Sequence, residues 1–370
     1  MASTTTEVSV GWVDDASNLS KRSKLLIMLG VLLGIFLEAL DQTIVATALP
    51  RIVREFQGIN LAAWVSTGYL LASTAFVPIY GKLSDVFGRR TILVFGILVF
   101  LSGSMLCGLA TSMLQLVVFR VIQGIGAAAL TSTAFAVPAD LYPPAERARA
   151  NGLIGATFGI ASILGPLVGG LLTDGPGWRW AFFVNIPFGI LALVVIIMRM
   201  PKFSSAQRDP IDWLGTALLL LAVVPLLLGL SLDKRQYPWN SPFILSLFVV
   251  ALVGGVALLA VERRVQSPII ALPLFRIRAF SVVSLLSFLV ILTILPSILF
   301  LPLFMVNVVG VSATAAGTVL IPQTLALVVT AIIGGNIVQR TGRYKLLMLV
   351  GLGVSSLVYM LMGTMGVNTG

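Results

Sequence analysis

The chain has 370 residues, of which 58% are hydrophobic and only 10% are charged, with a mean hydropathy of +1.04. Charged residues make up about 25% of an ordinary soluble domain, so this composition excludes one and indicates an integral membrane protein. With one cysteine, Cys107, and no histidine, the chain lacks the usual metal ligands and the usual catalytic base, so we expect no metal, no cofactor and no enzymatic activity.

Eleven apolar stretches are each long enough to cross a bilayer, which takes about 20 residues of helix. Transmembrane strands alternate apolar and polar residues, whereas these stretches are apolar throughout, so the predicted fold is an all-α membrane bundle. In chain order, the predicted helices are Leu25–Leu49, Trp64–Leu83, Thr91–Ala110, Met113–Val137, Asn151–Leu172, Phe182–Met200, Trp213–Leu232, Phe243–Val261, Ser281–Val306, Ala315–Val338 and Leu346–Gly366.

The N-terminal region could be mistaken for a signal peptide, because basic residues precede an apolar stretch. That stretch is too long for a signal peptide and carries Glu38 and Asp41 within it. We therefore expect residues 1–24 to form a cytoplasmic tail that is followed by a retained first helix.

The net charge of +10 is explained by topology, because cytoplasmic loops of membrane proteins carry the excess of Lys and Arg. With the N-terminus inside, 18 basic residues lie in inner segments, five lie in outer segments and Arg120 lies within a helix. We therefore expect a multi-pass protein of the cell (inner) membrane that contacts the lipid bilayer and binds no nucleic acid.

Two loops of similar sequence indicate an internal repeat. Gly81-Lys-Leu-Ser-Asp85-Val-Phe-Gly88-Arg89-Arg90 follows the second predicted helix, and Gly335–Tyr344 follows the tenth, with both glycines and one arginine matching. Glycine allows the tight reversal between antiparallel helices, and arginine anchors the loop at the inner surface. Two homologous halves are predicted, as in many transporters.

Four further motifs, together with the loop 81–90, resemble the major facilitator superfamily. Leu33–Pro50, which contains Asp41, resembles the first-helix motif of its fourteen-helix drug:proton antiporters, a branch of multidrug exporters. Leu116–Gly126 is similar to the fourth-helix arginine motif, Gly155–Gly170 to the fifth-helix antiporter motif, and Trp178–Pro187 to the entry of the sixth helix.

The resemblance implies a particular domain organisation. The first six-helix half is expected at residues 25–200, a cytoplasmic link at 201–212, two inserted helices at 213–261, a second link at 262–280 and a partial second half at 281–370. This second half supplies three helices where the family has six. We therefore expect a chain without the last three spans, which would be a fragment, a non-transporting product, or a chain completed by additional helices or a subunit.

Away from the span ends, three charged residues lie inside predicted spans, where charge is costly and functional roles are the default expectation. Asp41 and Arg120 lie about 13 Å and 12 Å from the outer ends of their helices, at a rise of 1.5 Å per residue, so they share a depth. Glu38 is one turn below Asp41 on the same face. We expect proton coupling at Asp41, with Arg120 as its partner. The alternative is a permanent ion pair that fixes helix packing. Glu38 is either a cation or proton site or a carboxylate in a water-filled vestibule.

The resemblance also implies roles for the loop and the glycine-rich helix. Residues Gly81, Asp85, Gly88, Arg89 and Arg90 would form a conformational latch, although the partner that the family provides for Asp85 falls in the absent thirteenth span. The antiporter motif would favour exchange over uptake, whereas its simpler interpretation is close packing of small residues. Its members are Gly155, Gly159, Gly165, Pro166, Gly169 and Gly170.

A substrate pocket is expected from Gln123 and from the aromatic residues Trp64, Tyr69 and Phe158, because aromatic faces attract cations. Such residues more often face lipid or fill gaps. The predicted function is a proton-coupled secondary transporter that exports amphipathic, cationic small molecules by alternating access. The alternative is export of a specific metabolite or peptide by the same mechanism.

Overall fold

The computed structural model describes residues 19–201, 211–265, 267–310 and 320–365. Six predicted segments fall partly outside these ranges: the N-terminal tail, the links 201–212 and 262–280, the partial second half 281–370, and the helices Ala315–Val338 and Leu346–Gly366. Within the described residues every regular element is helical, so the predicted all-α fold is confirmed.

Twelve α-helices form the described part of the chain, and nine candidate spans within it are long and apolar enough to cross a membrane. Short 3-10 helices at Ile59–Leu61 and Leu272–Arg276 connect neighbouring helices, and a π-helical turn, Met305–Val309, follows α11. The α-helices are α2 (Lys21–Phe56), α3 (Ala62–Phe87), α4 (Arg89–Gly108), α5 (Met113–Leu141), α6 (Pro144–Asp174), α7 (Trp180–Phe183), α8 (Asn185–Arg199), α9 (Trp213–Ser231), α10 (Pro242–Glu262), α11 (Arg278–Phe304), α13 (Leu320–Thr341) and α14 (Tyr344–Met362).

Helix boundaries differ from the sequence-based ones at two prolines. Helix α2 continues past Pro50 to Phe56 and ends where Gln57 adopts a left-handed conformation, φ 53°. The predicted sixth helix is divided into α7 and α8, and Pro187 lies in the first turn of α8. Proline is tolerated there because the first N–H groups of a helix have no partner within it.

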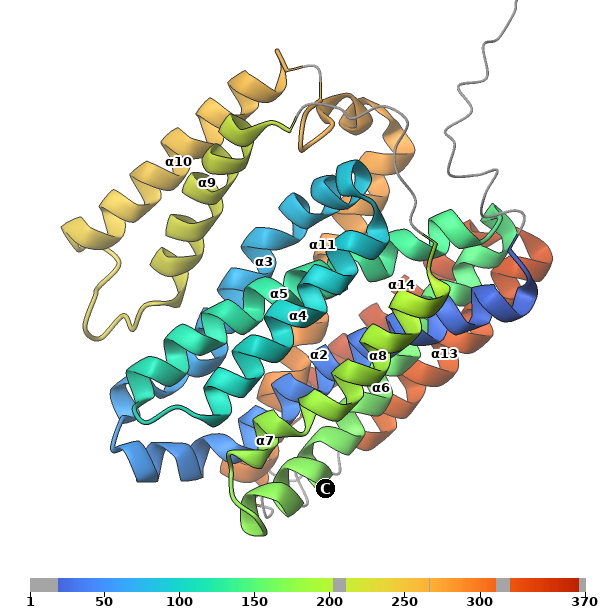
Figure 1. Ribbon diagram of the computed structural model, residues 1–370. Coiled ribbons are helices and arrows are strands. Elements are labelled where there is room, and N and C mark those ends of the chain that lie inside the picture. Colours follow the sequence, from blue (N-terminus) through green and yellow to red (C-terminus); the bar gives the residue numbers. More distant parts are fainter. Residues whose placement is uncertain (1–18, 202–210, 266, 311–319, 366–370) are drawn as a thin grey trace, which may run out of the picture. The chain divides into compact units, whose positions relative to one another are not determined.

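The chain forms two compact units, and the first contains residues 1–142 and 164–270. Helix α5 packs against α2, α3 and α4 within this unit (Figure 1). The approach is close because glycines leave no room for a side chain. A Cβ on Gly124 would collide with the backbone of Tyr69 on α3, and one on Gly103 of α4 would lie 2.7 Å from the backbone N of Gln123 on α5.

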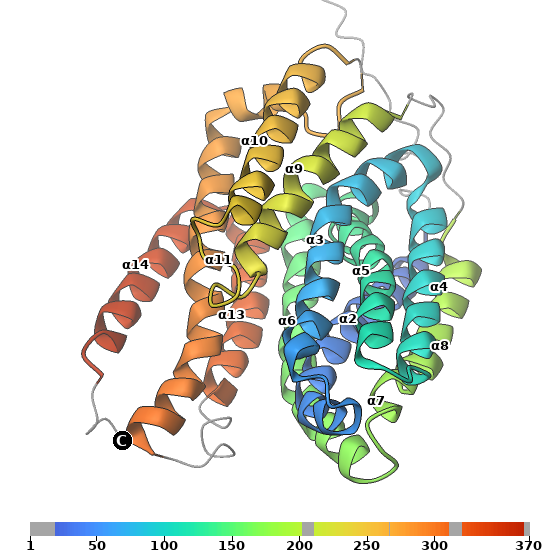
Figure 2. The ribbon, with the colours of Figure 1, turned by 90° about the vertical axis from the view of Figure 1, so that its left-hand side faces the viewer.

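Helices α9 and α10 form an antiparallel pair that belongs to the same unit (Figure 2). Leu219 of α9 and Leu258 of α10 pack against Ile79 in the C-terminal part of α3. The Lys82 ammonium, one turn further along α3, donates to the Ser267 hydroxyl at 2.6 Å. The pair is therefore joined to α3 by both apolar and polar contacts.

The second unit contains residues 143–163 and 271–370, with the first part of α6 and the helices α11, α13 and α14. The turn between α13 and α14 shares one backbone feature with the turn between α3 and α4. Gly88 and Gly342, the equivalent residues of the two loops, both have a positive φ, 87° and 65°. Glycine adopts this conformation without steric strain, which explains why the repeat carries glycine at both turns.

Candidate functional site

Asp41 lies at the centre of a buried polar network in the first unit. Its Oδ2 is bound by Arg120 Nη1 of α5, and the two side chains are 0% and 1% exposed. Its Oδ1 accepts a hydrogen bond from Gln123 Nε2 at 2.9 Å. The structure therefore brings together Asp41, Arg120 and Gln123, although Gln123 was expected in a substrate pocket rather than beside the carboxylate.

Asn185, the first residue of α8, completes the set of donors to Asp41. Its Nδ2 donates to Asp41 Oδ1 at 2.7 Å and to the Ser104 hydroxyl of α4 at 2.9 Å, and the Ser104 hydroxyl donates to the Phe182 carbonyl at 2.8 Å. Both Asn185 and Ser104 are 0% exposed. Helices α2, α5 and α8 thus meet at one carboxylate, and α4 is joined to it through the bond between Ser104 and Asn185.

Arg120 is held from several sides. Its Nε donates to the Val65 carbonyl at 3.1 Å, and its Nη1 also donates to Gln123 Oε1 at 2.9 Å. The guanidinium lies 4.1 Å from the centre of the Tyr69 ring, where the aromatic face attracts a cation. Tyr69 therefore contacts the buried arginine, and because it is 0% exposed it is not accessible to a substrate in this arrangement.

Glu38 has a partner of its own. The Thr131 hydroxyl of α5 donates to Glu38 Oε2 at 2.5 Å, and Glu38 is 5% exposed. No ion pair to Glu38 is found in the described part of the chain. A buried carboxylate without a positive partner is costly to keep ionised, which makes Glu38 a group that a proton or a cation can stabilise.

The expected latch loop forms a compact polar cluster at the ends of α3 and α4. Arg89 pairs with Asp85 at 2.6 Å and with Asp140 of α5 at 3.0 Å, and its Nη1 also donates to Ser84. Arg90 instead donates to the Ile197 carbonyl of α8 at 2.7 Å. Gly81 has open space around it, whereas Gly88 provides the reversal between the two helices.

The glycine-rich motif lies on α6, which is one continuous helix with Pro166 inside it. A Cβ on Gly165 or Gly169 would collide with Thr43 or Thr47 of α2, so these two glycines allow close contact with the helix that carries Asp41. A Cβ on Gly170 would have none of the described residues within 4 Å. Gly155 and Gly159 fall in the part of α6 that belongs to the second unit.

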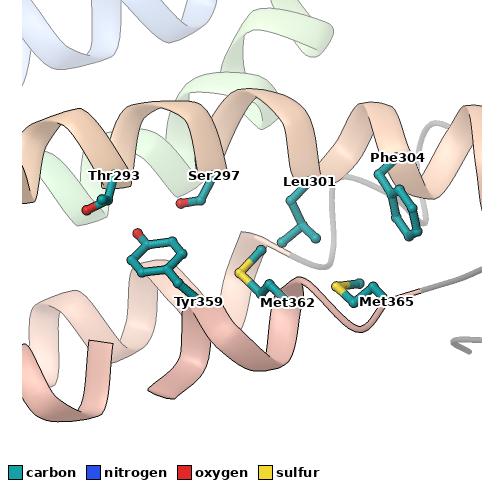
Figure 3. A pocket seen from close by; sticks show the side chains of 7 residues that line it. All are labelled: Thr293, Ser297, Leu301, Phe304, Tyr359, Met362 and Met365. Carbon is teal, nitrogen blue, oxygen red and sulfur yellow. The ribbon is translucent and has the colours of Figure 1, made fainter. Parts of the chain in front are cut away.

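The remaining expected pocket residues are more exposed. Trp64 on α3 and Phe158 on α6 are half-buried, and Phe158 belongs to the second unit. A different cavity, of about 450 Å³, lies between α11 and α14, and its lining side chains are drawn in Figure 3. None of the sequence-predicted site residues lines it; its lining residues are Thr293, Ser297, Leu301, Phe304, Tyr359, Met362 and Met365.

Sequence reasoning missed Asn185, Ser104, Thr131 and Asp140 as members of these clusters. Asn185 stood within the quoted motif Trp178–Pro187, so an uncharged polar residue at the start of an apolar helix was the available signal. Serine and threonine are common in membrane helices, because their hydroxyls can bond to the backbone of their own helix. The sequence therefore carries no comparable signal for Ser104 and Thr131.

Known proteins are similar to this chain over most of its length. The family model described as Major Facilitator Superfamily matches residues 31–369. Multidrug resistance protein 3 of Bacillus subtilis (strain 168) is 41% identical over 336 residues, which cover 91% of this chain and 65% of that protein. Multidrug transporter protein MdtP of the same organism is 38% identical over 350 residues, covering 95% of this chain and 64% of that protein.

Among solved structures, the proton:xylose symporter XylE bound to 6-bromo-6-deoxy-D-glucose superposes with a TM-score of 0.55 at 16% identity. The match covers 86% of this chain and 70% of XylE. At this identity the likeness shows the fold alone. The chain spans somewhat less than two thirds of the length of the two Bacillus relatives.

Proposed function

Because the chain belongs to the major facilitator superfamily, we propose that it acts in a proton-coupled secondary transporter that exports amphipathic, cationic small molecules. The observation that carries this proposal is the ion pair between Asp41 and Arg120, which is closed to solvent and lies among four helices. Two relatives that bear multidrug names support the substrate class.

Asp41 can serve as the proton carrier because its charge decides whether the buried Arg120 has an ion-pair partner. Arg120 stays protonated, so it stabilises the ionised carboxylate by direct charge attraction. Protonation of Asp41 removes that attraction and leaves a buried, unpaired guanidinium, which favours a different packing of α2 and α5. A proton that enters from outside would therefore favour one conformation, and its release inside would favour the other.

Glu38 is proposed as the group that recognises positive charge. It lies one turn from Asp41 on α2, and its described partner is the neutral Thr131 hydroxyl. A cationic substrate would supply the positive charge that this carboxylate lacks. A proton would do the same in the absence of substrate, so that drug and proton would compete for the two carboxylates of α2.

The loop 81–90 and the glycine contacts of α6 are proposed to govern the conformational change. The Arg89 cluster joins α3, α4 and α5 at one end of the first unit. Gly165 and Gly169 allow α6 to pack closely against Thr43 and Thr47 of α2. These two threonines follow Asp41 by two and six residues. A change at Asp41 could thus be transmitted to α6, the antiporter helix. The N-terminus is proposed to be cytoplasmic and the membrane to be the cell (inner) membrane.

The proposal is tested with the protein in inverted membrane vesicles that carry an imposed pH gradient. We expect tetraphenylphosphonium, a lipophilic cation, to accumulate and to dissipate the gradient, and a neutral lipophilic compound to accumulate as well. Glu38→Gln should reduce cation accumulation more than neutral accumulation. A protein that moves neither class but moves one metabolite or one peptide would instead favour the alternative, a dedicated exporter.

A further inference from the structure

We propose that the side-chain amide of Asn185 reports the protonation state of Asp41, by donating a hydrogen bond to the ionised carboxylate and accepting one from the protonated form. This inference rests on the proposed function, because it requires Asp41 to take up a proton. Asn185 would then be a positioning residue that transmits the charge of α2 to α4 and α8.

The three donors to Asp41 differ in their freedom to change role. Arg120 can only donate, because a guanidinium has no acceptor. Gln123 has both ends occupied: its Nε2 donates to Asp41, and its Oε1 accepts from Arg120 Nη1 at 2.9 Å and from the Cys107 thiol at 3.7 Å. Turning this amide over would place two donors against each other at Arg120.

Asn185 is different because one end of its amide is unoccupied. Its Nδ2 donates to Asp41 Oδ1 and to the Ser104 hydroxyl, but its Oδ1 is buried and has no hydrogen-bond partner among the residues that the structure describes. Rotation of the amide by half a turn about the Cβ–Cγ bond exchanges oxygen and nitrogen in nearly the same volume. The oxygen would then face Asp41 Oδ1 at about the distance that the nitrogen now occupies.

The protonation state of Asp41 decides between the two orientations. When Asp41 is ionised, an oxygen facing its Oδ1 would bring two acceptors together, so the amide nitrogen must face it. When a proton from water is bound to Oδ1, the new O–H needs an acceptor, and the amide nitrogen offers only N–H groups. The turned amide accepts that O–H. In either orientation one end of the amide lacks a partner among the described residues, so each orientation carries the cost of an unsatisfied group. The contact with Asp41 therefore decides which orientation is preferred.

Ser104 can follow the change. Its hydroxyl now accepts from Asn185 and donates to the Phe182 carbonyl, which also accepts from the Val184 N–H. When the amide oxygen faces Ser104, the hydroxyl can donate to that oxygen instead, and the Phe182 carbonyl keeps its backbone partner. The switch therefore reaches the break between α7 and α8 without leaving that carbonyl unsatisfied.

Charged and titratable groups from several helices surround Asp41, but none of those named below replaces Asn185 as the group that changes from donor to acceptor. Arg120 of α5, Tyr69 of α3, Cys107 of α4 and Glu38 of α2 are within electrostatic range of Asp41. Helix α8 contributes the Asn185 amide to the described contacts of Asp41. Of the two amides that donate to Asp41 Oδ1, Asn185 is thus the one that can change from donor to acceptor, because turning Gln123 would break the bond from Arg120 Nη1 to Gln123 Oε1.

Infrared difference spectroscopy of the purified protein in lipid nanodiscs, between alkaline and acid pH, tests the inference directly. The carboxylic acid C=O band of Asp41 is identified by its loss in Asp41→Asn. In the unaltered protein this band should lie at the lower frequency of a hydrogen-bonded acid, and in Asn185→Leu, which keeps the shape but removes the acceptor, it should move to higher frequency. Asn151→Leu, at an exposed position of α6, is the matched control and should leave the band in place.

A second measurement requires no substitution at Asn185. Labelling asparagine side-chain amides with ¹⁵N should reveal an amide band that changes with pH in the unaltered protein and does not change in Asp41→Asn. An Asp41 band of unchanged frequency in Asn185→Leu, or no pH-dependent asparagine band, would overturn the inference while leaving proton uptake by Asp41 intact. Absence of any acid band that depends on Asp41 would overturn the proposed function as well.

Discussion

Gly165 of α6 lies so close to Thr43 of α2 that the space between the two helices admits no Cβ. Thr43 is two residues from Asp41, and its hydroxyl bonds to the backbone of its own helix, to the carbonyls of Ala39 and Leu40. The antiporter motif therefore determines how close α6 approaches the segment of α2 that carries the buried carboxylate.

The first prediction follows from this contact. Gly165→Ala should lower stability by about 1–3 kcal/mol, because an added methyl group forces α2 and α6 apart. Gly170→Ala is the matched control, since a Cβ there has open space, and it should leave stability unchanged or slightly raised. Thermal unfolding in detergent measures both. Equal thermal stability of the two variants would show that the contact between Gly165 and Thr43 does not contribute to stability.

The Arg89 cluster predicts a difference between adjacent arginines. Arg89→Ala removes two ion pairs and leaves the half-buried Asp140 without one of its partners, so we expect a loss of about 1–3 kcal/mol. Arg90→Ala removes a single hydrogen bond to a backbone carbonyl and should cost about 1 kcal/mol or less. Unfolding at increasing concentrations of a denaturing detergent measures the stability of both variants. A larger loss for Arg90→Ala would contradict the importance of the cluster.

Cys107 offers a natural reporter of the network, because it is the single cysteine of the sequence. Its thiol is 0% exposed and contacts Gln123 Oε1, so reaction with N-ethylmaleimide in native membranes should be slow. Gln123→Ala removes the side chain that the thiol contacts and leaves space beside it, so it should raise the alkylation rate by about tenfold or more, because a buried thiol reacts when its surroundings open locally. Gln115→Ala, which removes an exposed amide in the first turn of α5, should leave the rate unchanged.

The proposed orientation is tested across a single helix, α10. In a Cys107→Ser background, Arg235→Cys lies before α10 and should react with an impermeant thiol reagent added to intact cells. Arg264→Cys lies after α10 and should react only when the membrane is opened. The opposite pattern would place the N-terminus outside.

The sequence predicted the helices well because the apolar stretches are long and the bilayer requires every backbone group to be bonded within the helix. It was less informative at boundaries. Pro50 lies within α2 rather than at its end, and the sixth predicted helix is divided before Asn185. Local propensity does not determine these points, because packing between helices decides where each one ends.

The charged residues of the site could be predicted from the sequence, whereas the uncharged ones could not. Asp41 and Arg120 are conspicuous in an apolar sequence, and their equal depth followed from the helical rise. Asn185 and Ser104 are uncharged, and Tyr69 contacts Arg120 from a third helix, so their positions depend on tertiary packing. Which face of each helix meets Asp41 cannot be read from spacing within any one helix.

The central claim is that Asp41 couples substrate movement to protons, and Asp41→Asn tests it most directly, because the amide keeps the shape but cannot take up a proton. In inverted vesicles with an imposed pH gradient, we expect Asp41→Asn to insert normally and to lose gradient-driven accumulation of tetraphenylphosphonium, while the unaltered protein accumulates it. Gradient-driven accumulation by Asp41→Asn at the rate of the unaltered protein would contradict the account.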